Sequence, residues 1–163
     1  MLHKGATNKE IRNGQGRDIR SFPSLAHAVA SLSFYNRDHV LLFRGQGEDF
    51  RNLDDNTSIQ PKIFRGYRNE LRFEWHAIIN DRYMRLVRAE ELLVEAWKRN
   101  KLPDQLRIER HRSIRWAVIQ HYEICATPLL DVTQSLRIAA TFALRNAVDD
   151  EAFLYVLAVP QIS

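Results

Sequence analysis

The sequence predicts an α+β fold in which a small mixed sheet packs with several helices. Two short apolar runs, residues 39–43 and 152–159, are bounded by turn residues and indicate buried strands. Between them, at about 68–100, apolar side chains recur at three- and four-residue spacing, which predicts a long helix. The chain has 163 residues, 45% of them hydrophobic, which is enough for one domain with a buried core.

The N-terminal half begins with a segment that shows no apolar periodicity. Residues 1–18 are rich in Gly, Asn and charge, so we expect a flexible arm at 1–18 and the folded domain at 19–163. A helix is expected to begin near Ser21, because Pro23 suits a first helical turn and a polar residue just before it can cap. This helix ends before residues 36–38, and the first strand follows.

The C-terminal half predicts two further helices and two strands. The helices are expected at 105–122 and 135–147, the second with a cap from Thr133 or Ser135. A short strand is expected at 129–132 and the last at 152–159. The last strand is apolar on both faces and therefore belongs inside a sheet. We expect either a sheet that ends there or a chain that is a piece of a longer protein, truncated at its C-terminus.

Composition and motifs exclude several classes of protein. No apolar run approaches the roughly 18 residues of a membrane span, and no signal-peptide pattern begins the chain. A single cysteine, Cys125, rules out an internal disulfide and fits a reducing compartment, so the sequence predicts a cytoplasmic protein without a membrane partner. No zinc-ligand spacing or phosphate-binding loop is present. Cys125 could pair with His121 as a nucleophile, but a packing role is the more frequent one.

The basic residues favour an anionic ligand. Of the 24 basic residues, 19 are arginines and only five are lysines, although the net charge is a modest +4. Arginine presents a planar fork of donors that matches phosphates and carboxylates. The arginine content therefore favours a nucleotide or nucleic acid as partner. The alternative is a compositional bias on a solvated surface.

The most informative short motif lies where the first strand ends. Arg44, Gly45 and Gln46 follow the buried Phe43, so the guanidinium is expected at the rim of the sheet, and Gly45 would let a ligand approach the backbone. The alternative is that Arg44 pairs with an internal carboxylate. Arg65 lies beside another turn, where a plain surface loop is the more frequent reading.

A second group of polar residues comes later in the chain. Gln120, His121 and Tyr122 end a predicted helix, and Asp131 ends a predicted strand just before a helix N-terminus, which favours anions. Asp131 could orient His121 or accept a hydrogen bond from a ribose hydroxyl. The alternative is that it caps the following helix.

Together these pieces resemble the FRG domain, a family of largely bacterial and phage proteins named for a (Phe/Tyr)-Arg-Gly motif. The resemblance runs from about residue 21 to residue 159 and rests most on 120–122 followed by 127–133, and then on the Ala-x-x-Phe-Ala pattern at 139–143. The chain departs from the family pattern at Glu123, where glycine is usual, and at Val132, where tryptophan is usual.

The family's layout is similar to that of ADP-ribosyltransferase folds, and this resemblance implies NAD as a substrate. It implies an anion clamp for the pyrophosphate, and an acceptor near the 2′-hydroxyl that helps to stabilise an oxocarbenium-like ribose. The implied catalytic residues are Tyr122, Glu123 and Asp131. The implied ligand-binding residues are Arg44, Gly45, Gln46, Arg65, His121, Thr133 and Ser135.

Three functional hypotheses follow. The first is an NAD-consuming transferase or hydrolase that acts as a toxin or anti-phage effector. The second is a module that binds or senses a nucleotide, a nucleic acid or a partner protein without chemistry. The third is a subunit of an oligomer or assembly whose long helix packs on a partner.

Overall fold

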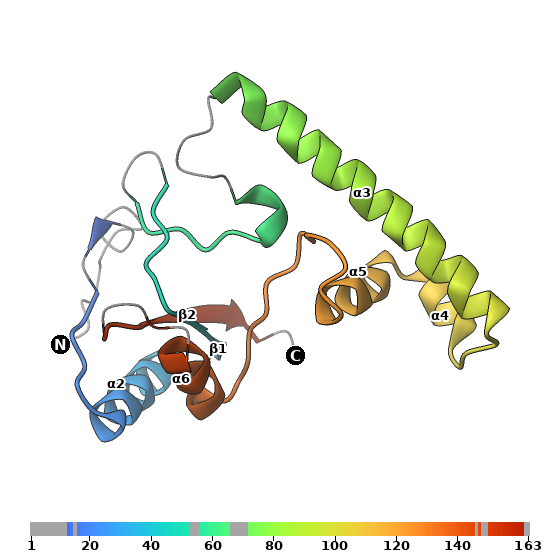
Figure 1. The fold of residues 1–163 in the computed structure, drawn as a ribbon. Coiled ribbons are helices and arrows are strands. Elements are labelled where there is room, and N and C mark those ends of the chain that lie inside the picture. Colours follow the sequence, from blue (N-terminus) through green and yellow to red (C-terminus); the bar gives the residue numbers. More distant parts are fainter. Residues whose placement is uncertain are drawn as a thin grey trace. The chain divides into compact units, whose positions relative to one another are not determined.

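A computed structural model describes residues 13–14, 16–52, 56–65, 72–145, 147 and 150–161 (Figure 1). Most of the arm predicted at 1–18, and the first residues of the helix predicted at about 68–100, lie outside these ranges. The chain divides into two compact units. Unit 1 comprises Met1–Ile59 and Asp131–Ser163, and unit 2 comprises Gln60–Leu130. Each unit is described by itself.

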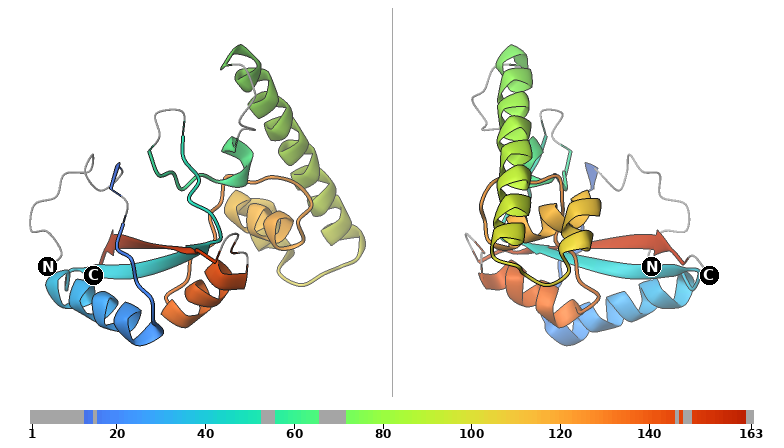
Figure 2. Two further views of the ribbon diagram at one scale, coloured as in Figure 1. Left: turned by 60° about the vertical axis from the view of Figure 1, so that its left-hand side comes forward. Right: turned by 90° about the vertical axis from the view of Figure 1, so that its right-hand side faces the viewer.

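Unit 1 is a two-stranded antiparallel sheet with two helices on one face. Strand β1 (His39–Gln46) pairs with β2 (Phe153–Pro160), and the register sets Arg44 opposite Tyr155. Helix α6 (Leu136–Arg145) contacts both strands, and α2 (Phe22–Tyr35) contacts β1. Figures 1 and 2 show both helices against the same face of the sheet. The opposite face carries every second residue of each strand.

The core of unit 1 lies between the two helices and the sheet face that carries Phe43. Phe43 is 5% exposed and packs with Val29 of α2 and Ala139 of α6. Fully burying a side chain of the size of Phe or Val contributes about 1.5–3 kcal/mol, so these contacts hold the helices on the sheet. Helix α2 begins as predicted, since the backbone N–H of Ser24 donates to the Ser21 hydroxyl (3.3 Å) and Pro23 lies in the first turn.

Unit 2 is helical. It contains a short 3₁₀ helix, η1 (Lys62–Phe64), and the helices α3 (Arg72–Arg99), α4 (Gln105–Arg110) and α5 (Arg112–His121). Figure 1 shows α3 as one continuous helix. Its core joins Ile63, Leu86 and Ile119, all fully buried. No helix within the described ranges is both long enough and apolar enough to cross a bilayer.

The α+β class is confirmed. The sheet in the described residues is two-stranded and antiparallel, not mixed, so β2 does not lie between two other strands as predicted. Two further expected elements differ from the structure. The single helix predicted at 105–122 is two helices, because the backbone of His111 is extended (φ −109°, ψ 102°). The strand predicted at 129–132 does not form. Instead Thr133 alone makes an antiparallel bridge with Phe43.

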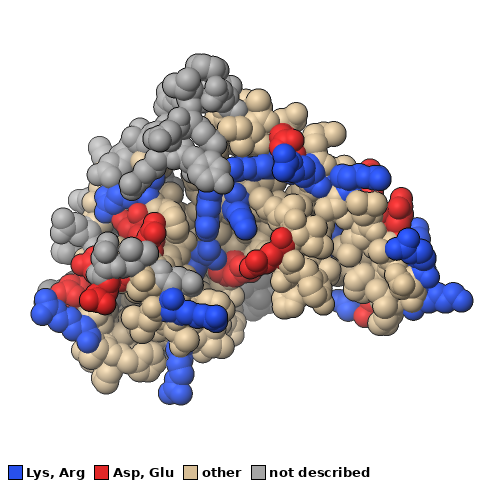
Figure 3. Space-filling model, viewed as in Figure 1, with Lys and Arg blue, Asp and Glu red and all other residues tan. Residues whose placement is uncertain are grey.

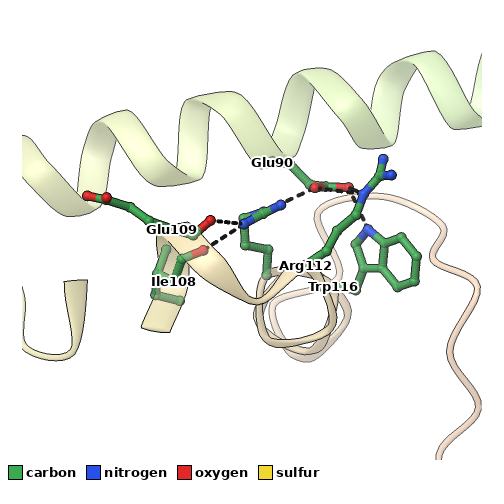
Figure 4. Close-up of polar contacts among 6 residues, drawn as sticks. Glu90, Ile108, Glu109, Arg112 and Trp116 are labelled. Carbon is green, nitrogen blue, oxygen red and sulfur yellow. Dashed lines mark hydrogen bonds and ion pairs between the residues drawn. The ribbon is translucent and has the colours of Figure 1, made fainter. Parts of the chain in front are cut away.

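A buried carboxylate ties the helices of unit 2 together. Glu90 of α3, 6% exposed, accepts hydrogen bonds from Arg112 Nε (2.9 Å), Arg115 Nε (3.0 Å) and Trp116 Nε1 of α5 (Figure 4). Burial alone would raise the pKa of Glu90. The three hydrogen bonds and the charge of Arg112 outweigh this effect and hold the pKa below its usual value.

Candidate ligand site at the end of strand β1

Phe43 positions both sides of the candidate site. Its side chain is part of the unit 1 core, and its backbone exchanges two hydrogen bonds with Thr133, at N–O distances of 2.7 and 2.9 Å. The segment that contains Asp131 is thereby held beside β1. Arg44 and Asp131, which are 87 positions apart in the sequence, thus meet at the end of β1.

Gly45 is required by the packing of α6. A Cβ atom at this position would lie 1.9 Å from the carbonyl oxygen of Ala139 and 2.7 Å from the backbone nitrogen of Ala143. Side-chain carbons do not tolerate such distances, so only glycine allows α6 to lie this close to β1. The backbone that approaches Gly45 in this structure is therefore that of α6. A ligand contact at Gly45 stays a prediction.

Arg44 points to the sheet face opposite Phe43 and Gly45, because successive strand residues alternate. Its Nε donates to Gln46 Oε1 (3.2 Å), and its Nη1 donates to the backbone carbonyl of Asp131 (2.7 Å). These two contacts orient the guanidinium at the strand end. Arg44, Gln46 and Asp131 are three predicted site residues that the structure brings together.

Gln46 is the least satisfied polar side chain of this face. It is 5% exposed, and its Nε2 has no hydrogen-bond partner among the described residues. Leaving a buried donor without an acceptor costs about 1–3 kcal/mol. The Tyr155 hydroxyl is the group that this donor faces, since a hydrogen bond from the Gln46 side chain lowers the pKa of that phenol.

A cluster around Asp49 continues the same face. Asp49 accepts hydrogen bonds from the Tyr155 hydroxyl (2.8 Å), from the Thr57 hydroxyl (3.0 Å to each oxygen) and from Arg51 Nε (2.9 Å). Burial raises the pKa of Tyr155, and its hydrogen bond to Asp49 raises it further, so the phenol stays protonated and donates. A hydrogen bond from the Gln46 side chain acts in the opposite direction and lowers this pKa.

Sequence reasoning missed Asp49 and Tyr155. They lie 106 positions apart, and no motif marks either residue. The available signal was the alternation of β1 and β2, which places Tyr155 on the Arg44 face once the register is known.

Thr133 and Ser135 form the N-terminal cap of α6. The backbone N–H of Ser135 donates to Thr133 Oγ1 (3.0 Å), and that of Ile138 donates to Ser135 Oγ (3.3 Å). The predicted cap is thus confirmed, and the donors of this helix end are partly occupied by its own side chains. The ligand-binding roles of Thr133 and Ser135 stay predictions.

The remaining predicted site residues belong to unit 2. His121 and Tyr122 end α5 with their rings in edge contact (centroids 5.0 Å apart), and the Tyr122 residue is 70% exposed. Glu123 follows in the left-handed region, at φ 52°. Arg65 Nε donates to the Gln60 carbonyl (2.9 Å). The predicted site therefore falls into two sets, one in each unit.

Other candidate chemistry in unit 2 is structural. The Thr127 hydroxyl, in a residue that is 1% exposed, donates to Gln120 Oε1 and fixes the loop after α5. Cys125 packs against the unit 2 core. Burial, and secondarily the charge of Glu90, raises the pKa of its thiol, which disfavours the reactive thiolate. Within the described part of the chain no cluster of His, Cys, Asp or Glu could hold a metal ion.

The charged side chains show no single-sign surface on the face drawn in Figure 3. Lys and Arg side chains are interspersed there with Asp and Glu. Exposed charges of α3 also pair with opposite charges, as Arg85 does with Asp81 (2.9 Å) and Arg88 with Glu91 (3.0 Å). This distribution gives little support to an extended nucleic-acid interface on that face.

The fold and the strand-end cluster define a small α+β domain with a candidate ligand site in unit 1. The family model of the FRG domain matches residues 39–152. The chain belongs to the FRG domain family. No curated protein and no solved structure matches the chain. The matched region contains every predicted site residue, whereas Tyr155 lies just beyond it.

Proposed function

We propose that this FRG-domain protein binds a nucleotide of the NAD type at the end of β1. The observation that carries the proposal is the oriented guanidinium of Arg44, held by Gln46 Oε1 and by the Asp131 carbonyl. A planar guanidinium in a fixed orientation is suited to a phosphate or pyrophosphate group, because little side-chain entropy remains to be lost on binding. This proposal rests on unit 1 alone.

The neighbouring loop supplies a second cation. Arg51 Nε donates a hydrogen bond to Asp49, which restrains the arginine side chain, and 31% of that side chain remains accessible. Arg51 and Arg44 belong to the same unit as the polar cluster around Asp49. A dinucleotide offers both a charged pyrophosphate and neutral ribose and base groups, which suits a site that combines arginines with uncharged donors.

The reaction that fits such a ligand is ADP-ribosyl transfer or NAD hydrolysis. The bond between ribose C1′ and the nicotinamide nitrogen would break, nicotinamide would leave with the bonding electron pair, and an acceptor oxygen or nitrogen would bond to C1′ and lose its proton. Asp131 is the candidate acceptor for the 2′-hydroxyl in unit 1. Tyr122, Glu123, His121 and Arg65 belong to unit 2, and their roles stay predictions. A protein that consumes NAD in this way would act as a toxin or anti-phage effector.

Binding is tested by calorimetry and thermal shift with NAD and ADP-ribose. We expect NAD to raise the melting temperature of the wild type, and the effect to be lost in Arg44→Ala. The matched control is Arg88→Ala, since Arg88 is an exposed arginine paired only through Glu91 in the described contacts. No binding of any nicotinamide nucleotide or ADP-ribose to the wild type would refute the proposal.

Catalysis is tested separately, by mass spectrometry of protein incubated with NAD and cell lysate. Released nicotinamide or transferred ADP-ribose would support the enzyme. Binding without either product would leave a module that binds or senses the nucleotide. If nucleic acid were the ligand instead, its affinity would fall steeply with salt, whereas NAD binding would change little.

A further inference from the structure

We propose that four basic side chains at one end of unit 2 contact the phosphate backbone of double-stranded nucleic acid. The four residues, called the basic corner below, are Arg99, Lys101, Arg107 and Arg110. They belong to the end of α3, the turn that follows it and α4, and Figure 1 shows this turn at one end of unit 2. The inference concerns a second ligand and is independent of the NAD-type site proposed in unit 1.

The positive charge of the chain is carried by unit 2. This unit contains 14 basic and nine acidic residues, whereas unit 1 contains 10 basic and 11 acidic residues. The net charge of +4 is therefore the result of +5 in unit 2 and −1 in unit 1. A positive surface attracts polyanions and speeds their encounter, so a nucleic acid is drawn to unit 2 rather than to unit 1.

The basic corner differs from its neighbours in having no partners. All four residues are exposed, and no side chain of the four forms a hydrogen bond or an ion pair with another described residue. The other basic side chains between positions 81 and 115 do pair with carboxylates or carbonyls, namely Arg82, Arg85, Arg88, Lys98, Arg112 and Arg115. The donors of the basic corner are therefore available to an external anion.

Few negative charges oppose the basic corner. The carboxylate of Glu109 is already held by Gln105 Nε2 (2.8 Å) and by Lys98 Nζ (3.3 Å). The charge of Arg110 also acts on this carboxylate, but no ion pair joins the two. Asp104 is the one exposed acid in the described stretch from the end of α3 to the end of α4, so the corner keeps an excess of positive charge.

The turn between α3 and α4 fixes where these charges lie. The backbone N–H of Leu102 donates to the Trp97 carbonyl (3.1 Å). That of Lys101 donates to the Lys98 carbonyl (3.1 Å), and the two bonds together form a Schellman helix end. Trp97 Nε1 donates in turn to the Pro103 carbonyl (2.7 Å). Lys101 has a φ of 50°, a left-handed conformation in which glycine is usual, and a lysine at such a position points to a use for its charge.

The residue types of the basic corner favour a duplex over a single strand. Residues 99–110 contain no aromatic side chain, whereas single-strand binding depends on bases that stack on aromatic rings. Arg107 and Arg110 lie three positions apart and therefore share one side of α4. Their planar guanidinium groups match phosphate geometry, and contacts to the backbone of a duplex require no exposed base. With four cations the corner is a small contact that does not depend on base sequence.

The test is the salt dependence of binding to a labelled DNA duplex of two helical turns, measured by fluorescence polarisation with the full chain. Four phosphate contacts predict a slope of about −3 to −4 for the logarithm of affinity against that of salt. Arg107→Gln/Arg110→Gln should weaken binding and reduce this slope by about 2. The matched control, Arg85→Gln/Arg88→Gln, removes two paired arginines of the same unit and should leave the slope unchanged. Equal effects of the two double variants would mean that only net charge matters, and the basic corner would be refuted.

Lys101→Gly separates binding from folding. Glycine suits the left-handed backbone, so this variant should melt at the temperature of the wild type or above it, while the salt slope falls by about 1. A lysine with a purely structural role would change the melting temperature and leave the slope as it is.

Two further ligands check the class of partner. A single strand of the same length should bind more weakly than the duplex, and an oligoglutamate peptide of equal charge should not displace the duplex. Tighter binding of the single strand, displacement by the peptide, or no binding of the duplex to the wild type at low salt would each overturn the assignment. Arg44 is unchanged in all these experiments, so their failure would leave the proposed NAD site standing.

Discussion

In the described part of each unit, a carboxylate with a largely shielded side chain accepts from an aromatic donor and from at least one arginine. Glu90 of unit 2 and Asp49 of unit 1 have side chains that are 8% and 13% exposed. Glu90 receives donors from three side chains of α5. Asp49 receives the Tyr155 and Thr57 hydroxyls and one Arg51 nitrogen. The chemistry is similar, so the difference lies in what each cluster connects.

The Glu90 cluster is closed. Arg115 also donates Nη1 to the carbonyls of Ile108 (2.7 Å) and Glu109 (2.8 Å), which joins α4 to the same network (Figure 4). The cluster around Asp49 reaches the sheet through Tyr155, which lies opposite Arg44 in the register of β1 and β2. A fully satisfied polar network fixes a fold. The comparison assigns a structural role to Glu90, whereas ligand binding on the face of Arg44 stays a proposal.

The largest effect is expected from Glu90→Gln. It leaves Arg112 and Arg115 without their carboxylate, and breaking a buried ion pair on one side costs about 3–5 kcal/mol. The measurement is chemical denaturation, with hydrogen exchange to locate the loss in unit 2. In the control, Glu91→Gln, an exposed pair with Arg88 is lost, and at most about 1 kcal/mol should follow. Equal effects of the two variants would contradict a structural role for the closed cluster.

The next effect is expected from Gly45→Ala in unit 1. The added Cβ meets the backbone of α6, which has no flexible end that can move away, so the cost should reach about 3 kcal/mol. Gly16→Ala is the control, since Gly16 has open space around it and only its φ of +75° resists the change, at about 1 kcal/mol. Hydrogen exchange should show the loss in α6 and β1. Similar costs for both variants would mean that α6 does not depend on the glycine.

The sequence predicted the features of the fold that depend on residues close together in the chain. The fold class, the cap at Ser21, both strands and the cap of α6 follow from residues near one another in the chain. The end of α4 was not predictable, because His111 adopts an extended backbone without a proline or glycine to announce it.

The candidate site was only partly predictable. Arg44 and Gln46 lie in a recognisable motif. Asp49 meets Tyr155 only through the register of two strands more than 100 residues apart, which no short pattern encodes. Gly45 shows the same limit, since the motif marks the residue while its partner, the backbone of α6, is known only from the packing.

The two clusters should respond to opposite extremes of pH. The pKa of Glu90 is lowered in the folded state, so its contribution is present above the unfolded value of roughly 4.3 and is lost as the pH falls through the folded value. The pKa of Tyr155 is raised, so its contribution is present below the unfolded value of roughly 10 and declines as the pH rises above it. Hydrogen exchange should therefore show acid opening in unit 2 and alkaline opening in unit 1. Glu90→Gln should flatten the acid response and Tyr155→Phe the alkaline one. If Glu90→Gln and Tyr155→Phe gave the same pH dependence of hydrogen exchange, the acid opening could not be assigned to Glu90 or the alkaline opening to Tyr155.

The smallest effect on stability, and the most informative one, is expected from Tyr155→Phe. It removes one hydrogen bond to Asp49, which keeps Thr57 and Arg51, so about 1 kcal/mol should be lost. Trp116→Phe is the matched change in unit 2, where it removes the indole donor to Glu90. Both variants remove an aromatic donor to a largely shielded carboxylate, but only Tyr155 lies opposite Arg44 of the proposed site. NAD affinity, measured by calorimetry, should therefore fall several-fold in Tyr155→Phe and stay unchanged in Trp116→Phe. If both variants bind equally well, the cluster around Asp49 is as purely structural as the one around Glu90.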